Sequence, residues 1–343
     1  MIAPYDAPPA VRRVLVAGGG IAGVEAVLAL RAFAGDAVDV IVVDPGRRFT
    51  VPGTAPARAF GMGEGIDLRL ADVVDRAGAT LVGGRVASVD GGRHLATLDG
   101  GELLSYDALV LAVGARPLTA VPGALTFAGP GDVEAVRGMV DDVSRRGLRG
   151  AGVEMAFVVP EGCGWPLAAY ELALMTREHL EAEDAGDHVS ISVVTSEDAP
   201  LGLFGPDASA SVARSLARAR IDVVAGVSAR RWDAGRLELA DGHSLWADRV
   251  IALPVYRGPA IAGLPADADG FIPAEDDGRV PGVPDVWAVG DGTTNPVKQG
   301  GVACRQADAA AAAIADVFGV PVDEPPAHGG LSAWMWDGRR GRS

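Results

Sequence analysis

Lysine, cysteine and aromatic residues are all scarce in this chain of 343 residues. Its two cysteines are too few for a disulfide scaffold, so we expect a reducing compartment and a cytoplasmic protein. Lys298 is the only lysine among 30 basic residues, and 45 acidic residues give a formal net charge of −15. This charge disfavours nucleic acid and anionic membrane surfaces as partners.

Long apolar runs are missing as well. No stretch approaches the roughly 20 apolar residues of a membrane-spanning helix. Residues 1–13 lack the charged-then-apolar order of a signal peptide. We therefore predict a soluble protein with no integral membrane segment. With 49% hydrophobic residues, the chain is long enough to bury the cores of two domains.

The first strong motif is a glycine-rich turn near the N-terminus. The segment VRRVLVAGGGIAGVEAVLAL predicts a buried strand, a turn and a helix, with Gly18, Gly20 and Gly23 in the spacing G-x-G-x-x-G. The first glycine permits the turn, the second lets a pyrophosphate approach the backbone, and the third lets the helix pack on the strand. A second predicted strand ends at Asp44, where a carboxylate is expected to accept hydrogen bonds from a ribose. This segment predicts a dinucleotide site.

Two later segments have small residues where predicted strands end. SYDALVLAVGARP contains Ala112 and Gly114, and VPDVWAVGDGTTNPVKQGG contains Gly290 and Asp291 ahead of a long alanine-rich helix. Together with the N-terminal turn, these segments resemble the signature segments of flavoproteins with two dinucleotide-binding domains. The resemblance runs from about residue 11 to about residue 318. It implies that the first domain binds FAD, without a covalent bond to the protein.

The same resemblance implies which residues contact the FAD. Asp291 would bind the ribityl and pyrophosphate region, and the chain would pass the adenine at Val86. The loop PVKQGGVACRQAD resembles the segment that approaches the flavin ring. The implied contacts are Gly18, Gly20, Gly23, Asp44, Val86, Ala112, Gly114, Gly290, Asp291, Lys298, Gln299 and Gly300.

The order of the motifs predicts an α/β protein with two Rossmann-like three-layer domains, the second inserted in the first. The FAD-binding domain would be split between residues 1–118 and 258–322. Residues 119–257 would form an inserted NAD(P)-binding-like domain, entered and left through segments rich in proline and glycine. Residues 323–343 would be a short C-terminal tail.

The inserted domain has a degenerate copy of the glycine turn. Aligned on the helix glutamates, Glu25 and Glu171, the second copy has these residues at the three glycine positions: Gly164, Pro166 and Ala169. Pro166 lacks an N–H and adds a ring where a pyrophosphate must touch the backbone. Glu197, which follows the predicted strand HVSISVV, still offers a carboxylate to a ribose. We expect a damaged NAD(P)H site, and whether NAD(P)H binds at all stays open.

The stretch EGCGWP resembles the group of sulfide:quinone oxidoreductases, flavocytochrome c sulfide dehydrogenases and type II NADH dehydrogenases. In the sulfide:quinone enzymes a cysteine of this turn lies over the flavin, which implies that role for Cys163. The second active-site cysteine and the C-terminal amphipathic helices of those enzymes have no counterpart up to Ser343. The C-x4-C and C-x-x-C motifs of disulfide reductases are also missing.

Three residues are candidates for redox chemistry, Cys163, Lys298 and Cys304. A helix N-terminus next to Cys163 is expected to lower the pKa of its thiol. Lys298 would place a positive charge where it favours reduction of a flavin. Simple packing stays open as the role of both cysteines and of Trp165, whose ring would otherwise stack on the flavin or a flat substrate. The five histidines have no metal-ligand spacing, so we expect no metal.

The sequence therefore predicts an FAD-dependent oxidoreductase that passes electrons from NAD(P)H or a small reductant to a quinone or another diffusible acceptor. Two alternatives stay open. One is a sulfide:quinone-type enzyme that uses Cys163, and the other is a flavin-bearing electron-transfer subunit with little activity alone. The expected partners are a small-molecule donor and acceptor, and a homodimer or an electron-transfer partner is also compatible with the sequence.

Overall fold

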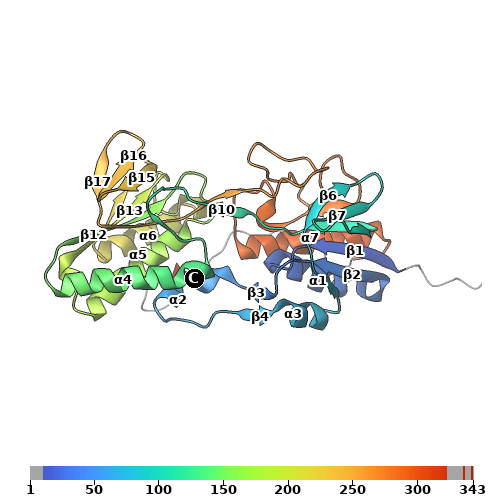
Figure 1. Cartoon of the computed structure of the whole chain (residues 1–343), viewed down its shortest axis with the longest axis horizontal. Helices are drawn as coiled ribbons and strands as arrows, with labels where there is room; N and C mark the ends of the chain where they lie inside the picture. The colour runs from blue at the N-terminus through green and yellow to red at the C-terminus, as the bar shows by residue number, and fades with distance from the viewer. Residues whose placement is uncertain (1–10, 323–334, 337–340, 343) are drawn as a thin grey trace, which may run out of the picture. The chain divides into compact units, whose positions relative to one another are not determined.

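The computed structural model describes residues 11–322, 335–336 and 341–342. The chain divides into two compact units (Figure 1). Unit 1 comprises residues 1–50, 66–116 and 257–329, and unit 2 comprises residues 51–65, 117–256 and 330–343. The sequence prediction had assigned residues 51–65 to the first domain, whereas their contacts assign them to unit 2.

Unit 1 is built on a parallel five-stranded sheet with the order β20-β9-β1-β2-β5. Its strands are β1 (Arg12–Ala17), β2 (Val38–Val43), β5 (Thr80–Val82), β9 (Ala108–Leu111) and β20 (Val286–Ala288). The other elements of this unit are α1 (Ile21–Ala34), β3 (Arg48–Thr50), β4 (Asp67–Arg69), α3 (Leu70–Arg76), β6 (Val86–Asp90), β7 (Leu95–Leu98), β8 (Leu103–Ser105) and α7 (Gly300–Val317).

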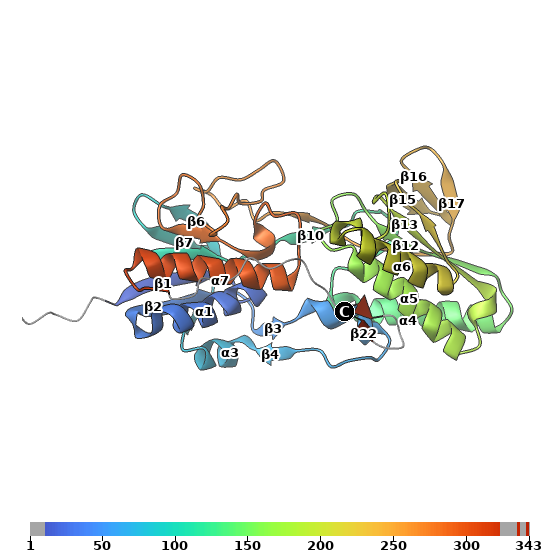
Figure 2. The same cartoon turned by 180° about the vertical axis from the view of Figure 1, so that it is seen from behind.

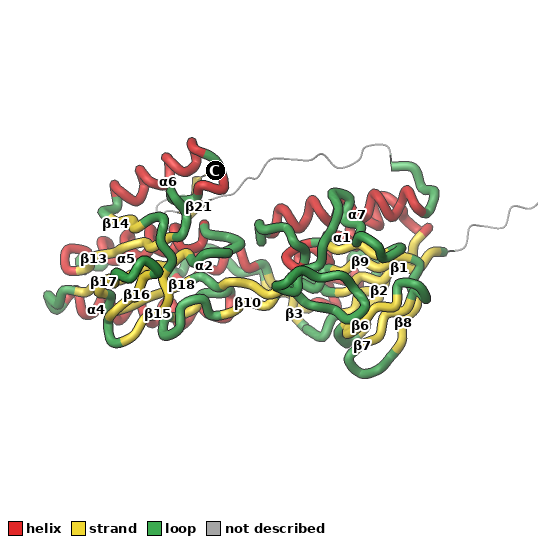
Figure 3. Tube along the Cα trace, turned by 90° about the horizontal axis from the view of Figure 1, so that it is seen from above, coloured by secondary structure: helices red, strands yellow, loops and turns green. Residues whose placement is uncertain are grey.

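The side chains of β1 alternate between two cores. Val14 and Val16 pack with α1 and α7, which lie side by side on one face of the sheet (Figures 2 and 3). Leu15 and Ala17 face the opposite way and pack against the small antiparallel sheet β6-β7-β8. Because successive side chains of a strand point to opposite faces, the four consecutive buried residues 14–17 of β1 indicate a sheet covered on both sides. Unit 1 therefore has three layers.

Unit 2 repeats this plan with a parallel sheet of order β11-β18-β12-β13-β14. Its strands are β11 (Leu125–Thr126), β12 (Val153–Val159), β13 (Val189–Thr195), β14 (Ile221–Val224) and β18 (Arg249–Ala252). The layers around it are α2 (Ala55–Ala59), α4 (Val133–Leu148), α5 (Leu167–Ala182), α6 (Pro206–Arg218) and the sheet of β15 (Ala229–Asp233), β16 (Arg236–Leu239) and β17 (Ser244–Trp246). Both units confirm the predicted α/β class with Rossmann-like domains.

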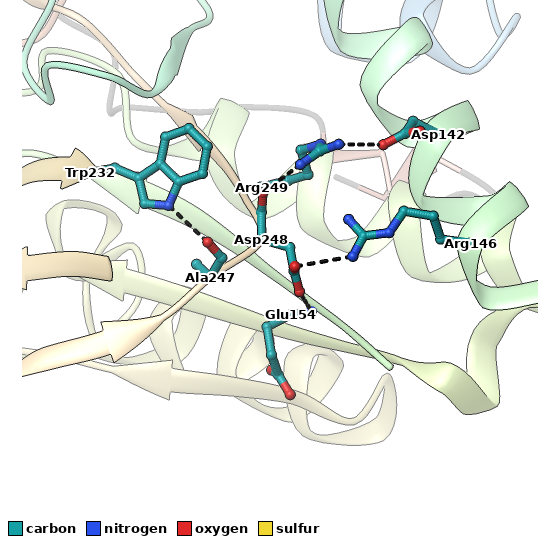
Figure 4. Close-up of polar contacts among 7 residues, drawn as sticks. All are labelled: Asp142, Arg146, Glu154, Trp232, Ala247, Asp248 and Arg249. Carbon is teal, nitrogen blue, oxygen red and sulfur yellow. Dashed lines mark hydrogen bonds and ion pairs between the residues drawn. The ribbon is translucent and has the colours of Figure 1, made fainter. Parts of the chain in front are cut away.

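Helix α4 buries its apolar face, and polar side chains of the helix form hydrogen bonds with residues of the sheet. Its valines at positions 133, 136, 140 and 143 are buried, which is the spacing of an amphipathic helix. Arg146 of α4 donates to Asp248 at 3.1 Å, and Asp248 also accepts from the N–H of Glu154 at 2.9 Å (Figure 4). Arg249 donates to Asp142 of α4 at 2.6 Å (Figure 4). These contacts join α4 to the first residues of β12 and β18.

Helix α2 belongs to unit 2 although its neighbours in sequence, β3 and β4, belong to unit 1. Ala55 and Ala59 are fully or almost fully buried in the core that α4 and α5 form. Arg137 of α4 donates to the carbonyl oxygen of Arg58 at 2.7 Å and to that of Ala59 at 3.3 Å. Since the last carbonyl groups of a helix have no partner within it, Arg137 acts as a cap for α2.

At the junction of the two units, β10 (Arg116–Leu118) and β19 (Val255–Arg257) form a two-stranded sheet. The predicted tail of residues 323–343 lies outside the described residues except for two strands. These are β21 (Met335–Trp336) and β22 (Gly341–Arg342), which pair antiparallel and belong to unit 2. Within the described part of the chain, no helix combines the length and the apolar character that crossing a bilayer requires.

Candidate functional site

Only three residues, 18–20, separate β1 from α1. Gly18 has φ +108°, and a Cβ there would overlap the carbonyl oxygen of Ala112 at the end of β9. A Cβ on Gly23 would overlap the carbonyl oxygen of Gly18. The close packing of the turn on β9 and of α1 on the turn therefore requires both glycines.

Gly20 is different. Its φ of −79° is open to any residue, and a Cβ on it would meet no heavy atom within 4 Å among the described residues beyond its local backbone. No side chain of the described residues caps α1 at Gly20, and the first turn of α1 contains no acidic residue. The first N–H groups of a helix lack partners within it and attract anions. The turn thus leaves room and hydrogen-bond donors for an anionic group at Gly20.

Asp44 follows β2 and is half-buried. Its carboxylate accepts from the N–H of Gly19 at 2.7 Å and from the N–H of Gly46 at 2.6 Å. These bonds orient the carboxylate beside the glycine turn. A carboxylate has about four acceptor positions, so Asp44 retains capacity to accept further hydrogen bonds.

Three further residues were predicted to contact FAD. Ala112 and Gly114 follow a strand of the parallel sheet, and Val86 lies in the core. Ala112 follows β9 and donates its N–H to the carbonyl oxygen of Ala17 at 2.7 Å. Gly114, two residues later, has φ +68°. Val86 begins β6 and is only 5% exposed, with its side chain inside the core between the two sheets of unit 1. The side chain of Val86 is therefore not available to a ligand.

The turn after β20 is held rigid by its own polar groups. The N–H of Gly290 donates to the side chain of Gln306 on α7 at 2.8 Å, and the hydroxyl of Thr293 donates to the carbonyl oxygen of Gly290 at 3.0 Å. The side chain of Asn295 accepts from the N–H of Val297 at 2.9 Å. Asp291 is therefore carried on a preformed turn. Sequence reasoning missed Gln306, whose only signal is an amide in a helix rich in alanine.

Lys298 is 9% exposed and points into this turn. Its ammonium group donates to the carbonyl oxygens of Thr293 at 2.8 Å and Asn295 at 2.7 Å, and lies 4.0 Å from the ring centre of Phe271. Burial lowers the pKa of Lys298 to about 8, against the opposing effect of Asp291 and Asp267. Burial likewise raises the pKa of Asp291, which Lys298 opposes. Lys298 thus fixes the backbone that carries Asp291.

The N-terminus of α7 is capped from within the chain. The side chain of Gln299 accepts from the N–H of Val302 at 2.8 Å. Gly300, the first residue of α7, has space beside it limited by Ile21 of α1, since a Cβ there would lie 3.3 Å from that side chain. Of the two helix N-termini in this region, α1 is therefore the one without a side-chain cap among the described residues.

Cys304 lies one turn into α7 and is partly buried. Burial raises the pKa of its thiol to about 11, and the charge of Glu25 and a hydrogen bond to Glu25 add to the rise. Burial and the same Glu25 also raise the pKa of Asp308. At neutral pH Cys304 is a thiol, and a thiolate is the reactive form.

Cys163 belongs to unit 2, in a turn of seven residues, 160–166, between β12 and α5. Cys163 and Trp165 pack against the core of this unit, and the ring of Trp165 meets Phe204 edge-on at 5.4 Å between ring centres. Burial raises the pKa of Cys163 to about 12, although a hydrogen bond to the Trp165 backbone lowers it. The predicted lowering of this pKa is therefore wrong, because desolvation outweighs the helix N-terminus.

The Glu197 carboxylate forms its hydrogen bonds within unit 2. One oxygen of its carboxylate accepts from the hydroxyl of Tyr170 at 2.6 Å, from that of Thr195 at 3.2 Å and from the N–H of Leu201 at 3.4 Å. The sequence left Glu197 available to a ribose in a damaged site, and it gave no sign of the hydrogen bond from Tyr170.

Apart from Val86, the predicted residues of unit 1 lie at or after one edge of its parallel sheet. They follow the carboxyl ends of β1, β2, β9 and β20, which are neighbours in a parallel sheet. β2 lies on one side of β1 and β9 on the other, and the crevice at such a reversal of strand order is where open α/β sheets bind ligands. In the described part of the chain, no group of three or more His, Cys, Asp or Glu side chains is placed to hold a metal ion.

This fold and this turn define an α/β protein of the Rossmann-like class. The sequence model of the pyridine nucleotide-disulphide oxidoreductases matches residues 12–312. The chain belongs to this family of oxidoreductases, as the predicted resemblance implied.

Individual relatives agree with the family. An NADH dehydrogenase-like protein of Mycobacterium tuberculosis is 30% identical over 230 residues, which are 65% of this chain and 57% of the relative. The match thus spans little more than half of that protein's length. A sulfide:quinone oxidoreductase of Aquifex aeolicus matches with a TM-score of 0.81 at 21% identity, over 90% of this chain and 78% of the other. NDH2 of Plasmodium falciparum, in complex with NADH, matches with a TM-score of 0.63 at 16% identity, over 82% and 64%. These two structures show a shared fold.

Proposed function

We propose that the protein is an FAD-dependent oxidoreductase whose unit 1 holds the FAD without a covalent bond. The observation that carries this proposal is the open space in front of Gly20. Packing requires Gly18 and Gly23 to be glycine but does not require it at position 20, where a glycine lets a ligand approach the backbone closely in the G-x-G-x-x-G turn. The ligand that fits is the pyrophosphate of a dinucleotide, next to the uncapped N-terminus of α1.

The residues of unit 1 would hold and orient the cofactor. The α1 turn binds the pyrophosphate, Asp44 accepts from the adenosine ribose, and Asp291 accepts from the hydroxyl groups of the flavin side chain. Lys298 and Gln306 act as positioning residues, because they fix the turn that carries Asp291. When bound, FAD supplies the capacity to take up and pass on electrons, and the protein tunes it by charge and hydrogen bonding.

The proposed reaction takes electrons from NAD(P)H or a small reductant and delivers them to a quinone or another diffusible acceptor. The family membership of the protein and its NADH dehydrogenase-like relative support an enzyme that transfers electrons. A sulfide:quinone-type reaction through Cys163 is less favoured, since this thiol has a pKa of about 12 and is protonated at neutral pH.

A substitution at Gly20 separates cofactor binding from folding. We expect the purified protein to be yellow and to release FAD on acid or heat treatment. Gly20→Val should lose the FAD yet keep its melting temperature in the cofactor-free form, because a side chain there meets no neighbour. Gly100→Val is the matched control, since Gly100 is also open and lies in the turn between β7 and β8. It should keep the flavin.

A colourless wild-type protein that cannot be reconstituted with FAD would disprove the proposal. Steady-state oxidation of a reductant with an artificial quinone would separate an enzyme from an electron-transfer subunit with little activity alone. Anaerobic stopped-flow reduction of the bound flavin by NADH, NADPH and sulfide, in separate experiments, identifies the electron donor.

A further inference from the structure

The two units allow an internal comparison of their nucleotide turns. In unit 1 the last residues of β1 and β2 are paired, and the residue after β2 is Asp44. In unit 2 the last residues of β12 and β13 are paired in the same way, and the residue after β13 is Ser196. Ser196 therefore occupies the position of Asp44. Glu197 lies one residue further, in the bend that follows β13, and so does not take the position of Asp44.

The Glu197 carboxylate is held by a hydrogen bond from α5. Tyr170 is completely buried, and its hydroxyl donates to Glu197 at 2.6 Å. Burial and then Glu197 raise the pKa of Tyr170, so its hydroxyl keeps the proton that it donates. Thr195 and the N–H of Leu201 contribute further bonds to the same oxygen. Three hydrogen bonds, from Tyr170, Thr195 and Leu201, thus meet at one carboxylate oxygen.

The turn itself also differs between the units. Seven residues connect β12 to α5, whereas three connect β1 to α1. Pro166 is the N-cap of α5 and has no N–H, while Gly20 is the N-cap of α1. Trp165 and Phe204 pack edge-to-face beside the start of α5. The turn in unit 2 therefore lacks the short glycine backbone that a pyrophosphate approaches in unit 1.

We propose that Tyr170 and Glu197 form a structural tie in place of a ribose contact, so that unit 2 does not bind a pyridine nucleotide. This inference rests on the function proposed above. It implies that the electron donor is a reductant without an ADP-ribose group. Pyridine nucleotides would reduce the flavin only by collision, without a saturable complex.

The test is a calorimetric titration of the full-length protein with NADH, NADPH and ADP-ribose. We expect no saturable binding with a Kd below about 1 mM. In stopped-flow experiments, the rate of flavin reduction by NADH should rise linearly with NADH concentration. Saturable binding in the micromolar range would overturn the proposal.

Glu197→Gln tests the tie itself. If Glu197 is structural, this variant should melt at a lower temperature than wild type and give the same flat titration. An unchanged melting temperature, or a nucleotide complex that Glu197→Gln weakens, would assign the carboxylate to a ligand. The titration is repeated with Gly20→Val, in which a side chain fills the open turn of unit 1, so that any nucleotide binding is assigned to unit 2. A wild-type protein without FAD would contradict the proposed function, whereas the titration of Gly20→Val still reports on unit 2.

Discussion

Two tyrosines of this protein are buried to a similar degree but have different surroundings. The hydroxyl of Tyr170 donates to the Glu197 carboxylate at 2.6 Å, whereas the hydroxyl of Tyr106 has no hydrogen-bond partner among the residues that the structure describes. The ring of Tyr106 stacks on His94 at 5.5 Å between ring centres. A phenylalanine keeps such a ring contact and removes only the hydroxyl.

The two Tyr→Phe substitutions should therefore differ in effect. Tyr170→Phe removes a bond to a charged group and should destabilise unit 2 by about 1.5–3 kcal/mol. Tyr106→Phe removes an unsatisfied group and should change stability by less than about 0.5 kcal/mol, or increase it. Thermal unfolding followed by circular dichroism measures both. Equal destabilisation by the two substitutions would contradict the role assigned to the hydroxyl of Tyr170.

Lys298 links stability to pH. Because burial lowers its pKa from 10.5 to about 8, the unfolded chain binds more protons than the folded one between these values. The stability contributed by this position therefore rises with pH across that interval. We expect the melting temperature of wild type, relative to Lys298→Met, to increase from about pH 8 to about pH 10. A constant difference across this range would place the lysine in solvent.

The residues of the site differ in how far the sequence determines them. Gly18, Gly20 and Gly23 were predictable because their roles follow from a local pattern of strand, turn and helix. The partners of Lys298 are also local, but their geometry depends on how the turn folds. Tyr170 was not predictable, since its hydroxyl meets a residue 27 positions away. A hydrogen bond between distant segments leaves no periodic signal in a single sequence.

At the scale of elements, α4 is joined to the sheet of unit 2 through Asp248. Burial alone would raise the pKa of this carboxyl, but the N–H of Glu154 and the Arg146 guanidinium outweigh burial and lower it. Asp248 thus contributes stability above its unfolded pKa of about 3.9, and the contribution is lost as the pH falls through the folded pKa.

Replacing the Asp248 carboxylate should lower the free energy of unfolding at neutral pH. Asp248→Asn should destabilise the protein by about 1–3 kcal/mol at pH 7, and by less as the solution becomes acidic. Asp72→Asn is the control, because Asp72 pairs with Arg69 at 3.8 Å on the exposed surface, where ion pairs contribute little. Chemical denaturation at several pH values measures the difference. Equal effects of the two substitutions would show that the contacts of Asp248 are not important for stability.

The elements themselves were largely predictable, and one placement was not. Buried strands followed by glycine turns indicate parallel sheets, because such strands carry apolar residues on both faces. Helix α2 has only five residues, and its sequence APARA does not indicate whether its alanines pack in the core of unit 1 or of unit 2. Arg137, which caps α2, lies 78 and 79 residues from the carbonyl groups it binds. Packing between remote segments decided this assignment.

At the scale of the whole molecule, the two units have the same three layers and different turns. The turn in unit 1 keeps the room and the donors for a pyrophosphate, and the turn in unit 2 is longer and packed on its own core. Family membership agrees with this duplicated plan. The proposed division of labour, in which unit 1 binds the cofactor and unit 2 does not bind a nucleotide, rests on the local differences at positions 18–20 and 160–166.

The position of α2 predicts how fragments of the chain behave. A fragment of residues 117–256 lacks α2 and exposes the apolar surface of α4 and α5 that Ala55, Ala59 and Phe60 cover. We expect this fragment to bind the dye ANS and to aggregate. Adding a synthetic peptide of residues 51–65 should reduce both effects. A monomeric fragment that unfolds cooperatively without the peptide would show that α2 is not needed.

The placement of α2 also limits how this architecture can be recombined. An inserted domain with both ends at one junction can be exchanged between proteins as one continuous cassette. Here part of the second unit is encoded upstream, between two segments of the first. A crossover that replaces residues 117–256 alone would bring in a surface without a matching α2. Because unit 2 also includes residues 330–343, such exchanges require coordinated changes in three segments of the chain, which makes this pair of units difficult to recombine in evolution and in protein engineering.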